Sequence, residues 1–147
     1  MGSAGEYPAT GRQAVWVEKN VIGIRDVPVP ALSEGEVLIR IRACGICGSD
    51  LHAFHAEGWG RHLPGIGPGH ELAGEVAVLG PGVTGPAIGT RVAMFAGRTC
   101  RECVFCRSGR PQLCRKMRIA GGGYAGGMGE YFVAQAEYLY RIPDSLS

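Results

Sequence analysis

Long hydrophobic runs are missing from this sequence of 147 residues, and so is any charged segment followed by an apolar one near the N-terminus. A membrane-spanning helix needs about 20 consecutive apolar residues, and a secretory leader joins a positively charged start to an apolar stretch. We therefore expect a protein that crosses no membrane, is not exported and resides in the cytoplasm. The net charge is also small, at +2, so charge alone gives no reason to expect nucleic acid as a partner.

No helical pattern longer than about two turns is visible, and no internal repeat is present. The chain instead carries 25 Gly and 9 Pro, spread among short apolar segments. This composition is typical of strands joined by tight turns rather than of disorder. We predict a mainly β fold, a barrel with one cysteine-rich lobe attached. The predicted strands are 14–17, 21–27, 36–43, 72–79, 88–95, 130–134 and 138–142.

The segment 36–43 has the clearest alternation of apolar and polar residues in the chain. Every second residue from Val37 to Ala43 is predicted to point one way, while Arg40 and Arg42 point the other. This pattern predicts a half-buried strand, and a pair of cysteines follows directly at its end.

The stretch after this strand reads Cys-Gly-Ile-Cys-Gly-Ser-Asp-Leu-His, from Cys44 to His52. A thiolate is a soft ligand and an imidazole a borderline one, which suits zinc. If Cys47 binds the metal, the hydroxyl of Ser49 could reach an oxygen bound to that metal. His52 could then carry a proton from this hydroxyl toward solvent.

Residues 50–56 are predicted to form a short helical turn, with Ser49 or Asp50 as its N-cap. The glycine- and proline-rich segment 57–69 cannot continue a helix and is predicted to be a loop. Trp59 in this loop is a candidate pocket wall or, equally, a surface residue.

A second cluster, His70-Glu71, supplies the other ligands that such a zinc site would need. The two clusters lie far apart in the sequence, so the predicted site depends on the fold. Alternatively, Cys44 and Cys47 form a redox pair, or half of a zinc ribbon with Cys100-x2-Cys103. The gap between those pairs far exceeds the spacing of about 15 to 20 residues that is usual in a zinc ribbon, which argues against the ribbon. A lone histidine is more often structural, so the remaining two histidines, His55 and His62, are not included as ligands.

Four cysteines with the pattern Cys-x2-Cys-x2-Cys-x7-Cys give the most specific signal in the chain. In a protein that is not exported, cysteines are better explained as metal ligands than as disulfides. Four thiolates can enclose one zinc ion in a closed tetrahedral site. These thiolates with zinc carry a net charge of about −2, and we interpret the surrounding cations mainly as compensation for it. The four are Cys100, Cys103, Cys106 and Cys114, and the cations are Arg98, Arg101, Arg107, Arg110, Arg115, Lys116 and Arg118.

Three other interpretations of this lobe are weaker. A ferredoxin-type iron–sulfur cluster begins with the same spacing, but its fourth cysteine follows after three residues and precedes proline. Here it follows after seven and precedes Arg115. A basic zinc module on nucleic acid would need an exposed helix or stacking aromatic residues, and the lobe offers only Phe105. Disulfides would need an oxidising compartment. Structural zinc is therefore the prediction.

Taken together, the sequence resembles the zinc-dependent medium-chain alcohol dehydrogenases, with the polyol (sorbitol-like) branch most similar. The resemblance rests on Gly-Ile-Cys-Gly-Ser-Asp-x-His (45–52), Gly-His-Glu-x-x-Gly (69–74) and the four-cysteine lobe (98–118), in this order. It implies a GroES-like, partly open barrel, the N-terminal catalytic domain of these enzymes, over 12–147. Residues 1–11 are expected to be a flexible leader.

The resemblance also implies roles for individual residues. Cys47 and His70 match ligands of the catalytic zinc, and Glu71 matches a carboxylate that is a ligand or a close neighbour of the metal. Ser49 matches the hydroxyl that takes the proton of the alcohol, and His52 the outward relay. Asp50 would orient His70 or its neighbours without binding the metal itself. The four cysteines of the lobe match the structural zinc site, and Cys44, which matches no ligand, is expected to be a buried thiol.

In this family zinc activates an alcohol or polyol, which then gives a hydride to NAD or NADP. The sequence departs from the family pattern because it contains no strand–Gly-x-Gly-x-x-Gly–helix unit of a Rossmann domain. The glycine-rich segment 121–127 has no helix after it, and we interpret it as a turn. A further zinc ligand and the segment that completes the family barrel are also expected to lie outside these 147 residues. We therefore expect the chain alone to turn over no alcohol.

Two hypotheses follow. The chain is the catalytic domain of an alcohol or polyol dehydrogenase whose cofactor domain lies elsewhere, with a possible homo-oligomer in the complete enzyme. Alternatively, it is a stand-alone zinc-binding barrel without catalysis. One set of residues favours the first hypothesis, because a structural barrel needs none of them: Cys47, Ser49, Asp50, His52, His70 and Glu71. The missing cofactor domain favours the second.

Overall fold

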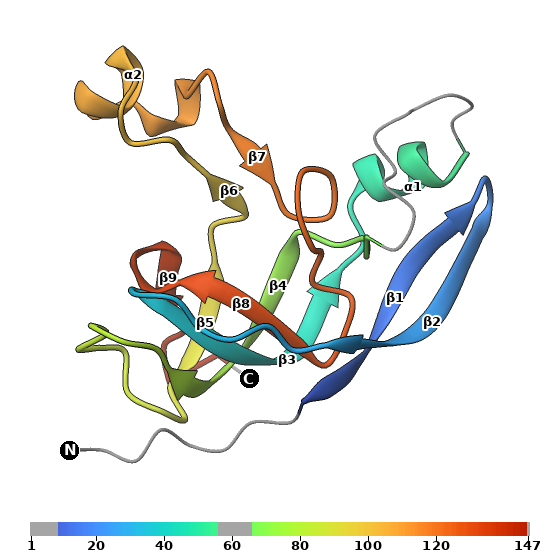
Figure 1. The fold of residues 1–147 in the computed structure, drawn as a ribbon, viewed down its shortest axis with the longest axis horizontal. Helices are drawn as coiled ribbons and strands as arrows, with labels where there is room; N and C mark the ends of the chain where they lie inside the picture. The colour runs from blue at the N-terminus through green and yellow to red at the C-terminus, as the bar shows by residue number, and fades with distance from the viewer. Residues whose placement is uncertain (1–8, 56–65, 147) are drawn as a thin grey trace.

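The computed structural model describes residues 9–55 and 66–146. Over these ranges the chain is mainly β and forms three antiparallel sheets (Figure 1): a central five-stranded sheet in the order β8-β3-β4-β5-β9, a β1–β2 hairpin and a β6–β7 ribbon. The strands are β1 (Thr10–Glu18), β2 (Val21–Pro28), β3 (Glu36–Gly45), β4 (Glu71–Leu79), β5 (Arg91–Met94), β6 (Gly97–Arg98), β7 (Arg118–Ile119), β8 (Tyr131–Gln135) and β9 (Leu139–Arg141).

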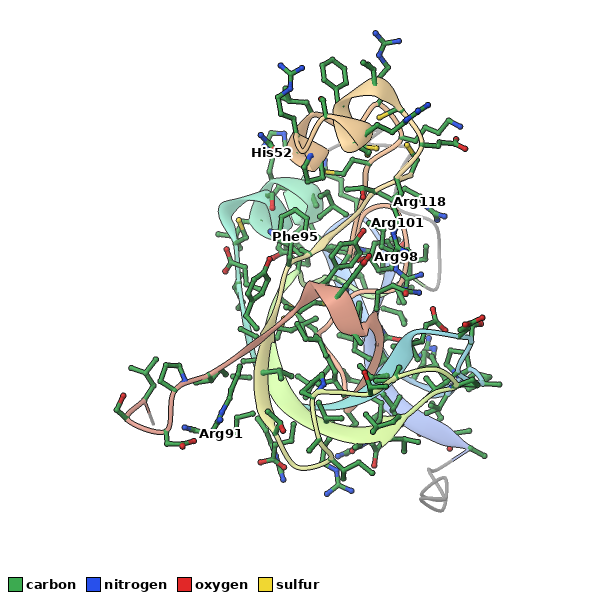
Figure 2. The ribbon with its side chains drawn as sticks, turned by 90° about the vertical axis from the view of Figure 1, so that its left-hand side faces the viewer. His52, Arg91, Phe95, Arg98, Arg101 and Arg118 are labelled. Carbon is green, nitrogen blue, oxygen red and sulfur yellow. The ribbon has the colours of Figure 1, made fainter. Side chains whose placement is uncertain are left out.

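Helical structure in the described residues is short. The segments are α1 (Gly48–His55), α2 (Val104–Arg107) and two 3-10 turns, η1 (Pro111–Leu113) and η2 (Ala136–Tyr138). The cysteine-rich lobe lies between β6 and β7 and stands apart from the central sheet, and α1 lies at the same end of the molecule (Figures 1 and 2). None of the described helices is long and apolar enough to cross a membrane.

Strand β3 is the centre of the fold, because it pairs with β8 on one side and with β4 on the other. Its antiparallel register with β4 ends where Gly45 faces Glu71. The residues that follow β3 and the residue that precedes β4 therefore emerge at the same edge of the sheet. This register brings the two sequence clusters together (Figure 1).

The predicted alternation of β3 is only partly correct. Val37 and Ile39 are fully buried as expected, but so is Leu38, and Ala43 is exposed. The physical reason is irregular pairing with β4, which shifts register between Leu38 and Ile39 and again between Ile41 and Ala43. An extra residue in one strand rotates the side chains that follow it.

Side chains from β3, β4, β5 and β8, together with Ala120 after β7, form one core. Its fully or almost fully buried members are Val37, Ile39, Leu72, Val76, Val92, Ala120, Phe132 and Ala134. Because these residues come from strands far apart in the sequence, burying them fixes the sheet order, and with it the edge at which the two clusters meet.

Three predicted boundaries are wrong. Strand β1 begins at Thr10, inside the expected leader. Strand β5 is limited to Arg91–Met94, because Gly89 adopts a φ of +83° in a turn that leaves Ile88 exposed. The short helix begins at Gly48, so Asp50 lies in its first turn. The predicted loop 57–69 and Trp59 lie largely outside the described residues.

Candidate metal centres

The four cysteines of the lobe converge on one point. The Sγ–Sγ distances are 3.5 Å for Cys100–Cys114, 3.6 Å for Cys103–Cys106 and 3.9 Å for Cys100–Cys106. All four sulfurs lie within 4.8 Å of one another. A tetrahedral zinc ion with Zn–S bonds of about 2.3 Å needs sulfurs about 3.8 Å apart. The spacing of these thiols therefore fits one tetrahedral ion of that size.

Backbone N–H groups point at these sulfurs. Cys100 N donates to Cys114 Sγ at 3.3 Å, and Cys103 N donates to Cys100 Sγ at 3.4 Å. The Cys106 N–H lowers the pKa of the Cys103 thiol to about 6, and the Cys100 N–H lowers the pKa of Cys114. Burial raises the pKa of Cys106 to about 11. The backbone thus stabilises negative charge on some of the four sulfurs, and a cation at their centre would allow all four to be thiolates.

The cations of the lobe do more than compensate for thiolate charge. Arg101 pairs with Glu137 and Lys116 with Glu102, and Arg98 lies 3.7 Å from a carboxylate oxygen of Glu36. The guanidinium groups of Arg110 and Arg115 lie 5.8 and 5.6 Å from the centroid of the Phe105 ring. Besides any compensation of thiolate charge, several of these cations therefore hold the lobe to itself and to the neighbouring strands and turns.

A second group of ligand-type side chains forms at the edge where β3 ends and β4 begins. Cys47 lies after β3, His70 just before β4 and Glu71 at its first residue. Their ligand atoms lie within 4.8 Å of one another. Cys47 and His70 are half-buried, and Glu71 is exposed. One thiol, one imidazole and one carboxylate thus face a common point that remains open on the Glu71 side.

Asp50 ties the two segments of this group together. Its Oδ2 accepts a hydrogen bond from Cys47 N at 2.9 Å, and its Oδ1 accepts one from Gly69 N at 3.3 Å. The first bond is the reach-back of an acidic residue in a helix's first turn to the N-cap N–H, with Cys47 as the N-cap. The same Oδ1 lies 3.9 Å from His70 Nδ1. One carboxylate therefore contacts both backbones that carry the ligands.

Ser49 and His52 belong to α1. The hydroxyl of Ser49 lies 3.5 Å from His70 Nε2. His52 is exposed one helical turn further along (Figure 2), on the same side of the helix as expected for residues three apart. The relay from Ser49 through His52 stays a prediction.

Other residues weighed from the sequence have different surroundings. His55 Nδ1 lies 2.9 Å from Asn20 Oδ1 and away from both ligand groups, while His62 lies outside the described residues. Cys44 is only half-buried, which corrects the expectation of a buried thiol. Burial nevertheless raises its pKa. All six cysteines are unbridged.

The glycine-rich segment 121–127 does more than turn. Gly126 and Gly127 are buried, and Gly127 N donates to Gly69 O at 2.9 Å. The segment therefore lies against the residues that lead into His70. Sequence reasoning missed this contact; the density of glycine was the signal that backbones approach closely there.

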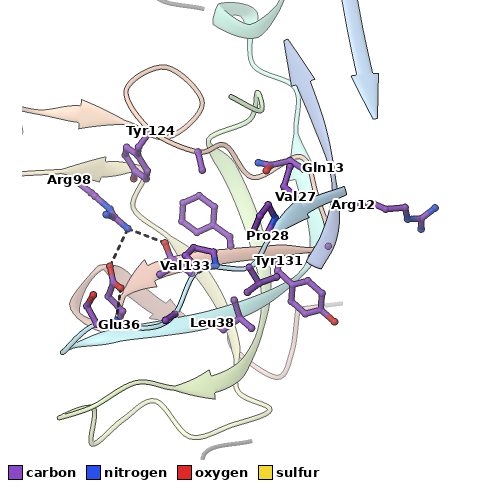
Figure 3. Close-up of a pocket in the computed structure, with 17 residues that line it drawn as sticks. Arg12, Gln13, Val27, Pro28, Glu36, Leu38, Arg98, Tyr124, Tyr131 and Val133 are labelled. Carbon is purple, nitrogen blue, oxygen red and sulfur yellow. Dashed lines mark hydrogen bonds and ion pairs between the residues drawn. The ribbon is translucent and has the colours of Figure 1, made fainter. Parts of the chain in front are cut away.

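A cavity of about 600 Å³ lies elsewhere, between the β1–β2 hairpin and β8 (Figure 3). Arg98 borders it, donates to Val133 O at 3.1 Å and lies 4.6 Å from the centroid of the Tyr124 ring. Phe132, Leu38 and Pro28 give it an apolar wall. None of the seven ligand-type side chains described above borders this cavity, so it is separate from both candidate metal centres.

Comparisons with known proteins agree with this geometry. The family model of the alcohol dehydrogenase GroES-like domain matches residues 33–144. The chain is 43% identical over 132 residues to an alcohol dehydrogenase from Geobacillus stearothermophilus, and 41% identical over 127 residues to an L-threonine 3-dehydrogenase from Francisella tularensis. The structure of acetophenone reductase from Geotrichum candidum in complex with NAD superposes with a TM-score of 0.83 at 32% identity.

These matches cover most of this chain but only part of each relative. They span 88% and 84% of this chain against 39% and 36% of the two curated relatives. For the reductase structure the shares are 97% and 43%. The chain thus corresponds to about two fifths of the length of the proteins it matches.

Proposed function

Because this chain belongs to the alcohol dehydrogenase GroES-like domain family, the N-terminal domain of zinc-dependent medium-chain dehydrogenases, we propose that it is the alcohol-activating part of such an enzyme. Its substrate is an alcohol or polyol, and the reaction is oxidation by hydride transfer to NAD or NADP. The cofactor is held by a part of the protein outside these 147 residues. The relatives act through whole chains more than twice as long.

The convergence of Cys47, His70 and Glu71 on one point carries this proposal. Catalytic zinc sites use three protein ligands and keep a fourth position for water or substrate, whereas structural sites are closed by four. Mixed donors with an exposed side suit the first kind, and the further ligand expected outside these 147 residues would join Cys47 and His70, with Glu71 as a ligand or a close neighbour of the metal. The four thiols of the lobe are the second kind, and we assign a structural zinc to them.

When bound, zinc acts as a Lewis acid that lowers the pKa of a coordinated hydroxyl, by about nine units in the case of water. The chain's own residues do the rest. Cys47, His70 and Glu71 would hold the ion, and Asp50 fixes the two backbones that carry them. The Ser49 hydroxyl, beside the His70 ring, accepts the proton of the alcohol as it gives its own proton to His52, which releases a proton to solvent.

Proton removal precedes hydride loss for a chemical reason. If hydride left a neutral alcohol, the product would be a protonated carbonyl, which is high in energy. Removing the hydroxyl proton first lets hydride leave as a neutral carbonyl forms. A nicotinamide accepts that hydride, as expected from a related reductase whose structure contains NAD.

Metal stoichiometry tests the proposal directly. We expect elemental analysis of the purified chain to find two zinc ions, falling to one in Cys47→Ala. In the cobalt-substituted chain, the visible absorption assigned to the Cys47 centre should shift when an alcohol or polyol is added. A single zinc that leaves only on unfolding, with no response to alcohol, would mean a structural module without catalytic metal.

An activity assay tests whether cofactor binding requires residues outside this chain. We expect the 147-residue chain, mixed with NAD or NADP and a panel of alcohols and polyols, to produce no sustained NADH or NADPH. Sustained production would show that these residues suffice for cofactor binding and would contradict this part of the proposal.

A further inference from the structure

We propose that Gly126 is a positioning residue for His70: the absence of a side chain there lets the glycine-rich segment 126–129 lie directly on the backbone of 67–69 and fix where His70 begins β4. This inference rests on the proposed function only in assigning His70 to a metal. The contact itself is independent of that assignment.

The contact is backbone on backbone. Gly127 N donates to Gly69 O at 2.9 Å, and Met128 N donates to Pro68 O at 3.1 Å. Gly67, Pro68, Gly69 and Gly126 are all buried. The three positions before His70, 67–69, are therefore held by main-chain hydrogen bonds and by close packing, not by large side chains.

Gly126 is the tightest point of this contact. A Cβ on Gly126 would overlap the carbonyl oxygens of Gly67 and Pro68, both of them backbone atoms that no side-chain rotation can move away. Gly69 is similarly confined, since a Cβ there would lie 2.7 Å from Cys44 Sγ and 2.7 Å from Met128 Cγ. Any residue larger than glycine at 126 must displace the backbone of 67–69, which leads directly into His70.

The other side of the segment is anchored to β1. Ala14 N donates to Met128 O at 2.8 Å, and the side chain of Gln13 donates to Gly126 O at 2.8 Å. Trp16 N donates to Ile66 O at 3.1 Å. Strand β1 thus holds both the glycine-rich segment and the residues before His70, so a side chain at 126 has no free space to occupy and displaces the backbone that leads into His70.

Displacement of this backbone changes the metal centre specifically. Gly69 N is one of the two donors to Asp50, and His70 follows directly. A shift of 67–69 therefore moves the His70 side chain relative to Cys47, which directly precedes α1. The four-cysteine lobe shares none of these contacts.

The test compares Gly126→Ala with Gly122→Ala in the 147-residue chain. Gly122 is a matched control, because it shares the stretch 121–127 with Gly126, is exposed, has no positive φ and has no atom within 4 Å of an added Cβ. Metal-free protein is titrated with Co²⁺, and the signal lost in Cys47→Ala identifies the centre of interest. We expect Gly126→Ala to weaken Co²⁺ binding there by about 10- to 100-fold, the usual effect of losing support behind a ligand. Binding to the lobe should not change, and Gly122→Ala should match the parent chain at both centres.

A metal-free measurement separates this inference from the proposed function. The imidazole nitrogen and carbon NMR signals of His70 should shift in Gly126→Ala and not in Gly122→Ala. If the parent chain binds only one Co²⁺, the proposed function fails, and the His70 signals alone decide whether Gly126 positions this residue. Unchanged His70 signals, or equal weakening of both centres, would overturn the inference.

If Gly126→Ala does not fold, Gln13→Leu provides a second test of the inference. It removes the hydrogen bond to Gly126 O without adding an atom to the contact. We expect a smaller loss of Co²⁺ affinity in the same direction, with the lobe unaffected. Parent-like affinity and parent-like His70 signals in this variant would count against the inference.

Discussion

The two candidate metal centres of this molecule are built in opposite ways. The four thiols of the lobe come from one short stretch, 100–114, and their sulfurs receive hydrogen bonds from neighbouring backbone N–H groups. The second group joins Cys47 after β3 to His70 and Glu71 at β4, and it exists only because these strands pair in one register. One centre is local in sequence and the other depends on the whole sheet.

The two centres also differ in their metal-ligand side chains. Four like donors enclose a position completely, which suits an ion that only stabilises the fold. Three unlike donors with an exposed Glu71 leave one side open, which suits an ion that meets a substrate. A closed four-thiol centre can stabilise the fold around it, whereas the open three-donor centre forms only where the fold has already brought its donors together. Each prediction below tests this contrast.

Removing metal from the lobe should have the largest effect. Structural zinc typically contributes about 10–16 kcal/mol of apparent binding free energy, and the lobe has little hydrophobic core of its own, since Cys114 is its only buried residue within 98–118. We expect a strong chelator to make 98–118 the first site of proteolysis, and added zinc to restore protection. Equal protease resistance with and without metal would contradict a structural role.

Removing a ligand of the second centre should abolish one metal site and leave the fold intact. We expect His70→Ala to lose the second zinc while the lobe keeps its own. The melting temperature should fall by less than about 4 °C, the shift that about 1 kcal/mol produces in a domain of this size. Elemental analysis and thermal unfolding measure both effects. A large loss of stability would mean that the second centre, too, supports the fold.

The same contrast explains what the sequence could predict. The lobe was readable because its ligand spacing is local. The Cys47 and His70 motifs suggested a shared site, but only the β3–β4 register brings their ligand atoms within 4.8 Å. The mainly β, GroES-like fold was predicted correctly through resemblance to a family. Roles for Ser49 and His52 remain predictions.

What could not be predicted depends on register shifts and on glycine. The exposure of Ala43 follows from a bulge that no alternation pattern contains. The contact of Gly126 with 67–69 joins segments nearly sixty positions apart through backbone atoms alone. Such contacts have no side-chain signature, because their only requirement is that side chains be absent.

Asp50→Asn tests how far the second centre depends on its support. An amide keeps one acceptor oxygen and cannot serve both Cys47 N and Gly69 N as the carboxylate does. We expect metal affinity at this centre to fall about 10- to 100-fold, measured by Co²⁺ titration, with the lobe unchanged. Asp26→Asn, on the exposed face of β2, is the control. Parent-like affinity in Asp50→Asn would mean that the strand register alone positions the ligands.

The smallest effect is expected from the exposed ion pair between Arg42 on β3 and Glu75 on β4, whose atoms lie 2.9 Å apart. The hydrogen bond from Arg42 lowers the pKa of Glu75 below its usual value of 4.5. A carboxylate with a lowered pKa in the folded state stabilises the fold above pH 4.5, and this contribution disappears as the pH falls through the lowered pKa.

We therefore expect Glu75→Gln to be slightly less stable than the parent chain at neutral pH, and the difference to vanish in acid, when urea unfolding is compared across pH. Both side chains are substantially exposed, so water and salt screen the pair. Metal binding at Cys47, His70 and Glu71 should not change, because backbone pairing along β3 and β4 holds the register. If Glu75→Gln weakened that binding, the open centre would depend on surface charge as well as on the sheet, and the contrast with the closed lobe would be sharper still.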